Sequence, residues 1–116
     1  MADLENGLYA GNTRYNSNNT PQSTDFVTAM IKGSSSGFAI KAGDASQGTL
    51  TTLYEGPRPA GYDVMKLEGG IILGIGGDNS NFAVGTFFEG CIISGYTSND
   101  VDAAIQANIV AAQYVV

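Results

Sequence analysis

The chain has 116 residues, of which sixteen are glycine and only 14% are charged, and this composition favours one domain of short strands and many turns over a helical bundle. Its net charge of −6 argues against the clusters of positive charge that hold nucleic acid or an anionic membrane surface. With no His and a single Cys, the chain has no His-ligated metal site and no internal disulfide, so acid–base chemistry must fall to carboxylates or tyrosines.

The first residues carry two acids, Asp3 and Glu5, in the segment MADLENG. A signal peptide would be basic and then apolar there, so we expect none in this chain, and no stretch is long and apolar enough to span a bilayer. In a strand both carboxylates would share one face with Leu4 on the other, an unusual arrangement because like charges repel. A solvated, frayed terminus is the alternative.

The next part of the chain predicts a polar loop followed by a three-stranded meander. Residues 11–24 are rich in Asn, Ser and Thr, which favour turns. Alternation over residues 25–32 puts Thr28, Met30 and Lys32 on one face, and residues 33–37 predict a turn into a second strand at 38–42. A third strand is expected at 49–54, ended by the Gly-Pro-Arg-Pro at 56–59. Three such strands form one sheet of a sandwich.

A loop is expected over residues 59–67, and Arg58, just before it, is expected in solvent rather than paired with a carboxylate. Residues 71–75 then predict a strand buried on both faces, because they are mostly β-branched and carry no charge. Gly76 and Gly77 end this strand, so Asp78 would emerge at the rim of the sheet, where a carboxylate is well placed for chemistry. Alternatively, Asp78 and its neighbour Asn79 are ordinary turn residues that cap their own backbone.

The last part of the chain predicts a strand and a helix. Residues 85–93 alternate cleanly, like the last strand of concanavalin-like sandwiches, and a Gly-Tyr turn follows. Asn99 is a plausible N-cap, with Asp100 and Asp102 suited to the positive end of the helix dipole. We expect the helix to pack on the sheet through a face that repeats every third or fourth residue, formed by Val101, Ile105, Ile109 and Ala112.

Four segments carry a family resemblance: MADLENG, GGIILGIGGDNSN, GTFFEG and QANIVAAQY. Together they closely resemble the catalytic domain of the arabinofuranosidase B family, glycoside hydrolase family fifty-four. The resemblance implies an all-β, concanavalin-like antiparallel sandwich, partial in this chain, with one C-terminal helix. Residues 1–116 would form a single domain corresponding to the C-terminal half of the family domain. The implied protein is secreted and removes terminal α-L-arabinofuranosyl units from arabinan and arabinoxylan with retention of configuration.

The resemblance also implies roles for individual residues. The glutamate of the Asp-Leu-Glu-Asn segment, Glu5, would be the nucleophile, and the aspartate after the paired glycines, Asp78, the acid/base. A retaining glycosidase needs two such carboxyl groups about 5 to 5.5 Å apart, and it needs no metal or organic cofactor. Further positions would contact the sugar, although some family members have Asn at the position of Gly7: Asp3, Asn6, Gly7 and Gly77.

The chain also departs from the family pattern. Members line the sugar site with two adjacent cysteines joined to each other and with a tryptophan, both from the half that this chain lacks, and this chain has no Trp and one Cys. A second hypothesis is therefore a non-catalytic fragment that binds carbohydrate weakly or self-associates. Sheet edges without neighbouring strands can pair with a strand of another chain, so we expect a second copy of this chain or a complementing chain as a protein partner. The other expected partner, implied by the resemblance, is an arabinose-containing polysaccharide.

Overall fold

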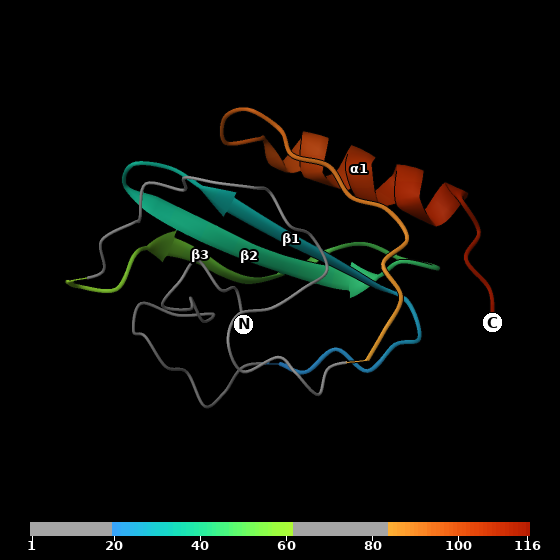
Figure 1. Ribbon diagram of the computed structural model, residues 1–116. Helices are drawn as coiled ribbons and strands as arrows, with labels where there is room; N and C mark the ends of the chain where they lie inside the picture. Colours follow the sequence, from blue (N-terminus) through green and yellow to red (C-terminus); the bar gives the residue numbers. More distant parts are fainter. Residues whose placement is uncertain (1–19, 62–83) are drawn as a thin grey trace.

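The computed structural model describes residues 20–61 and 84–116, which form an antiparallel sheet and a helix. The strands are β1 (Val27–Gly33), β2 (Gly37–Asp44) and β3 (Thr51–Pro57), and they lie in the order β1-β2-β3. Helix α1 (Asn99–Ala111) lies along one face of this sheet (Figure 1). The predicted meander and C-terminal helix are thus confirmed, whereas the predicted strand at 71–75 lies outside the described residues.

The β1–β2 hairpin has the predicted turn and face assignment. Antiparallel register runs from Val27 opposite Asp44 to Gly33 opposite Phe38, and Ser34 N donates to Gly37 O at 2.9 Å across the turn. Arg58 corrects our expectation of a solvated side chain, because its guanidinium donates to the carbonyl oxygens of Ser34 and Ser35 at 2.6 and 2.5 Å. A planar fork of donors fits two successive carbonyls of a turn, so Arg58 ties this turn to the end of β3.

Strand β3 begins and ends later than we expected. The proline at 57 was expected to lie beyond the strand, but Gly56 pairs with Phe38, and Pro57, opposite Gly37, is the last strand residue. Proline is tolerated at the end of an outer strand because no ladder hydrogen bond from its nitrogen is required there. The register between β2 and β3 shifts at Ile40 and Lys41, which marks a β-bulge or irregularity.

The expected last strand at residues 85–93 is not formed in the described structure, and this prediction is wrong. The segment has no regular secondary structure, and its large apolar side chains are exposed: Phe87, Phe88, Ile92 and Ile93. A strand exists only where a neighbour completes its hydrogen-bond ladder, and the described residues place no such neighbour beside it. The predicted Gly-Tyr bend is present, with Gly95 at a φ of 87°.

Helix α1 corrects two details of its prediction. Ser98, not Asn99, is the N-cap, and its side chain accepts a hydrogen bond from Val101 N at 3.3 Å. The buried residues are Asp102 and Gln106 rather than an apolar stripe, and Val101 is 43% exposed. The reason lies in the sheet, because Lys32 and Lys41 point toward the helix and require polar partners.

Aromatic contacts pack the two ends of the sheet. Phe38 and Tyr54, on neighbouring strands, have ring centroids 4.7 Å apart. At the start of β1, the rings of Phe26, Phe88 and Tyr114 contact one another at centroid distances of 5.5, 5.4 and 5.2 Å. This second group joins three segments that are far apart in the sequence. Among the described residues, no helix has the length and apolar character needed to cross a bilayer.

Candidate functional site

All the residues to which the sequence assigns a role at the sugar lie outside the described ranges. Glu5, Asp3, Asn6 and Gly7 belong to residues 1–19, while Asp78 and Gly77 belong to residues 62–83. Their assignment therefore stays a prediction. The described residues hold two other concentrations of polar groups, a buried cluster between helix and sheet and an open hollow at the end of β2.

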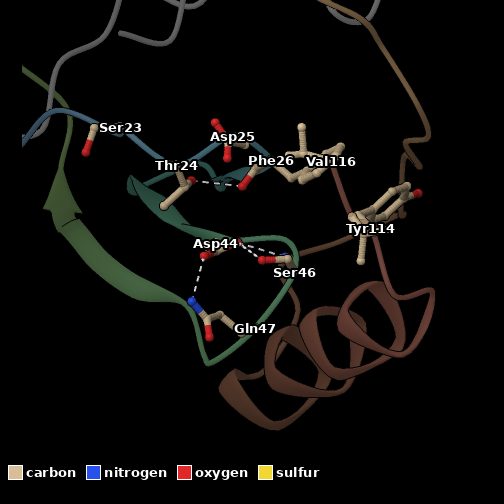
Figure 2. A pocket seen from close by; sticks show the side chains of 10 residues that line it. Ser23, Thr24, Asp25, Phe26, Asp44, Ser46, Gln47, Tyr114 and Val116 are labelled. Carbon is tan, nitrogen blue, oxygen red and sulfur yellow. Dashed lines mark hydrogen bonds between the residues drawn. The ribbon is translucent and has the colours of Figure 1, made fainter.

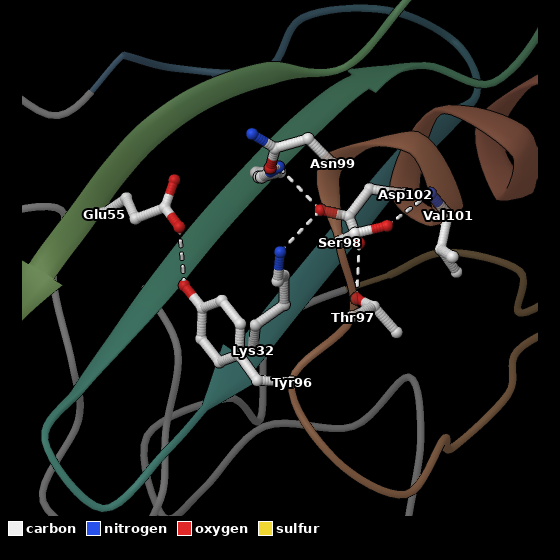
Figure 3. A network of polar contacts seen from close by, with 9 residues as sticks. Lys32, Glu55, Tyr96, Thr97, Ser98, Asn99, Val101 and Asp102 are labelled. Atoms are coloured by element: carbon white, nitrogen blue, oxygen red, sulfur yellow. Dashed lines mark hydrogen bonds and ion pairs between the residues drawn. The ribbon is translucent and has the colours of Figure 1, made fainter.

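The buried cluster is centred on the Asp102 carboxylate in the first turn of α1 (Figure 3). Its Oδ2 atom accepts hydrogen bonds from Lys32 Nζ at 2.7 Å and from Lys41 Nζ at 2.6 Å. Its Oδ1 atom accepts from the Thr97 hydroxyl at 2.5 Å, and Lys41 Nζ also donates to Asn99 Oδ1 at 2.7 Å. The three side chains that contact this carboxylate therefore all donate hydrogen bonds to it.

These contacts determine the protonation state of Asp102. Burial alone would raise the pKa of the carboxyl, but the hydrogen bonds from Lys32, Lys41 and Thr97 outweigh it and lower the pKa to about 2. Asp102 is only 1% exposed, and both lysines are at most 6% exposed. A charged carboxylate that is fully engaged and closed to solvent cannot exchange protons with a substrate. The cluster is therefore an anchor between helix and sheet.

The cluster continues to the outer strand through an aromatic ring. Lys32 Nζ lies 4.3 Å from the ring centroid of Tyr96, a cation–π contact, and the Tyr96 hydroxyl donates to Glu55 Oε1 at 2.8 Å. Burial and the hydrogen bond to Glu55 raise the pKa of Tyr96 to about 12. Tyr96 is thus a neutral hydrogen-bond donor at ordinary pH, and it connects the segment before α1 with β1 and β3.

The open hollow has a volume of about 420 Å³ and lies where the start of β1, the end of β2 and the C-terminal residues meet (Figure 2). Its walls include Asp25, Phe26, Asp44, Gln47 and Tyr114. Asp44 accepts from Ser46 N at 2.8 Å, Ser46 Oγ at 2.6 Å and Gln47 Nε2 at 3.2 Å. Those hydrogen bonds, led by that from the Ser46 side chain, lower the pKa of Asp44. Asp44 therefore caps the β2–β3 turn and is poorly suited to donate a proton.

Within residues 20–61 and 84–116, no three acidic or cysteine side chains gather closely enough to hold a metal ion. Cys91 is a free, exposed thiol. The side chains to which the sequence analysis assigns the chemistry lie outside the described residues.

The sequence prediction missed the buried cluster, although a signal for it was present. Alternation places Lys32 on the same strand face as Thr28 and Met30, and that face turned out to be the one covered by the helix. A lysine on an inward face requires an acid, because an unpaired buried ammonium is very costly. Asp102, in the helix expected to pack on the sheet, was the available partner.

Comparison with known proteins identifies the fold and the family. The chain matches the family described as alpha-L-arabinofuranosidase B, catalytic, over residues 1–115. It is 53% identical over 118 residues to a probable alpha-L-arabinofuranosidase B of Aspergillus niger, and 55% identical over 119 residues to an alpha-L-arabinofuranosidase of Hypocrea jecorina. The chain therefore belongs to the family of α-L-arabinofuranosidase B catalytic domains.

Solved structures agree with this membership. A GH54 α-L-arabinofuranosidase soaked with a cyclic sulfate inhibitor superposes on 100% of this chain and 25% of its own, with a TM-score of 0.85 and 52% identity. An arabinofuranosidase complexed with arabinofuranosyl-α-1,2-xylobiose covers 78% of this chain and 19% of its own, with a TM-score of 0.67 and 55% identity. The expected fold class, an antiparallel β fold with a C-terminal helix, is confirmed.

The match covers nearly all of this chain but a small part of its relatives. The aligned region is 99% of this chain and 24% of the Aspergillus niger protein, and 100% of this chain and 24% of the Hypocrea jecorina protein. The chain thus spans about a quarter of the length of these relatives.

Proposed function

We propose that this chain supplies both catalytic carboxyl groups of a retaining α-L-arabinofuranosidase. Glu5 attacks the anomeric carbon of a terminal arabinofuranosyl unit, and Asp78 first protonates the leaving oxygen and then activates the water that releases the sugar. The observation that carries this proposal is the family match over residues 1–115, a range that includes both acids. Asp3, Asn6, Gly7 and Gly77 contact the sugar in the proposed site, and no metal or cofactor takes part.

The substrate class follows from the same relationship. A relative has been complexed with an arabinofuranosyl xylobiose, and another, a glutamate-to-glutamine mutant, was soaked with 4-nitrophenyl α-L-arabinofuranoside. We propose that this protein acts on arabinose side chains of arabinan and arabinoxylan, as a secreted enzyme. Residues 1–116 form one domain that corresponds to the C-terminal half of a catalytic domain.

The test is hydrolysis of 4-nitrophenyl α-L-arabinofuranoside by two proteins. The first is the 116-residue chain, and the second is the Hypocrea jecorina relative in which this chain replaces the matching 119-residue segment. Activity of the chimaera that disappears in its Glu5→Gln variant supports the proposal. A folded chimaera that keeps its full activity as the Glu5→Gln variant would refute the assignment of Glu5, whereas Asp78 is tested on a substrate whose leaving group needs protonation.

A second candidate function is self-assembly through sheet edges. β1 and β3 are the outer strands of the described sheet, and each has one side that pairs with no other strand in the described residues. Unpaired backbone groups on such strands can accept a strand from another copy. Light scattering on the purified chain decides the matter, because a monomer at all concentrations would contradict assembly.

A further inference from the structure

The polar contact surface between helix α1 and the sheet contains two polar atoms without a partner. Thr28, on β1, is 8% exposed, and Gln106, on α1, is 2% exposed. Within the described part of the chain, neither the Thr28 hydroxyl nor the Gln106 side-chain oxygen makes a hydrogen bond. Buried polar atoms are nearly always paired with protein or with ordered water, so these two atoms together require an explanation.

The register of the sheet places Thr28 and Gln106 at the same end of the contact between α1 and the sheet. Gln106 Nε2 donates to Asp44 O at 2.7 Å, so its side chain lies over the end of β2. Asp44 pairs with Val27, and Thr28 pairs with the preceding Gly43. Thr28 shares its strand face with Lys32, which contacts the helix at Asp102. Thr28 therefore lies under α1, on the Gln106 side of the lysine cluster.

The contact with Asp44 also determines which atom of the Gln106 side-chain amide has no hydrogen-bond partner. A backbone carbonyl can only accept, so the nitrogen of the Gln106 side chain must face Asp44 O. The amide oxygen is then the unpaired atom, and it can only accept. The Thr28 hydroxyl can both donate and accept.

We propose that one internal water molecule binds between helix α1 and the sheet and bridges the Thr28 hydroxyl to the Gln106 side-chain oxygen. The water accepts from Thr28 Oγ1 and donates one hydrogen to Gln106 Oε1. These two polar groups give the water the minimum of two partners that an ordered internal water needs. The bridge would extend the polar contact between α1 and the sheet from the Asp102 turn to the Gln106 turn.

The first test is a double-mutant cycle on the free energy of unfolding of the full 116-residue chain, measured in urea. Thr28→Val and Gln106→Met each remove one partner of the water at nearly constant volume. If the water couples them, the combined effect on the unfolding equilibrium constant should differ from the product of the single effects by at least about threefold. The lost contact of Gln106 with Asp44 occurs in both arms of the cycle and cancels.

A control cycle combines Gln106→Met with Thr52→Val, because Thr52 is an exposed threonine on β3; this pair should be additive. The second test is a crystal structure of the chain at a resolution that shows ordered water. A water within hydrogen-bond distance of both atoms supports the proposal. Additivity of Thr28→Val and Gln106→Met would overturn it. So would a direct hydrogen bond between the two side chains, since no water would then lie between them.

Discussion

Lys41 Nζ lies 2.6 Å from Asp102 Oδ2, and this ion pair joins the middle strand of the sheet to the first turn of helix α1. Lys32 donates to the same oxygen at 2.7 Å. One carboxylate therefore balances two ammonium groups in a buried position, so the first turn of the helix depends on a single side chain for its docking.

We expect Asp102→Asn to destabilise the chain by about 3 to 5 kcal/mol, because it leaves buried ammonium groups without their counter-charge. Urea unfolding followed by circular dichroism measures the change. Asp100→Asn is the matched control, since Asp100 lies in the same helical turn but is exposed, and its effect should stay below about 1 kcal/mol. Equal effects of the two substitutions would contradict the anchoring role of Asp102.

The same carboxylate predicts a loss of stability in acid. The pKa of Asp102 in the folded chain is about 2, below its ordinary value of 3.8, so the unfolded chain binds this proton more tightly. Its stabilising contribution is complete above about pH 4 and is lost as the pH falls through about 2. Unfolding free energies measured across this range should fall more steeply for the wild-type chain than for Asp102→Asn. Parallel curves would show that another group titrates.

Two glycines of the β1–β2 hairpin should differ greatly in the stability lost when each is replaced by alanine. A Cβ atom at Gly37 would collide with the backbone carbonyl oxygen of Gly56, whereas a Cβ atom at Gly33 would meet nothing within 4 Å. Gly37→Ala should therefore destabilise the chain by about 1 to 3 kcal/mol through overpacking, while Gly33→Ala should change stability by less than about 1 kcal/mol. Thermal unfolding of the two variants under identical conditions provides the comparison.

If Asp78 is the acid/base, the loss of activity caused by its substitution should depend on the leaving group of the substrate. Asp78→Asn in the chimaera should lower kcat/KM on an arabinoxylan oligosaccharide by about 10² to 10⁴-fold, because its sugar leaving group needs protonation. The loss on 4-nitrophenyl α-L-arabinofuranoside should be smaller, since 4-nitrophenolate leaves without much help. Glu5→Gln should reduce both activities alike. An equal loss on both substrates with Asp78→Asn would argue against its role as the acid.

Local patterns were sufficient to predict part of the fold. Alternation and turn residues predicted the hairpin of β1 and β2, and the periodic C-terminal run predicted α1 within a residue of its start. Pro57 misled the prediction because proline is read as a strand breaker, although an outer strand tolerates it at its end. The strand prediction failed at residues 85–93 because the alternation of side chains shows which residues a strand would bury. It does not show which neighbouring strand would pair with it.

The buried face of α1 could not be predicted from the helix alone. Its apolar residues repeat at helical spacing, yet Asp102 and Gln106 are the buried ones, because their partners Lys32 and Asp44 lie 70 and 62 residues away in the sequence. Only the assembled sheet determines which helical face it accepts. The roles of Glu5 and Asp78 could not be predicted from local sequence either, because spacing alone cannot separate a catalytic carboxylate from a turn residue. Their assignment rests on the family resemblance.

The polar underside of α1 also constrains protein engineering. Asp102 and Gln106 are four residues apart, so both point to one side of the helix. Inserting one amino acid between them would rotate one contact about 100° away from the other, and no sliding of the helix could restore both. Loop grafts and fusions to this fold should therefore leave the stretch from Ser98 to Gln106 unchanged in length, whereas length changes after the helix do not alter this alignment.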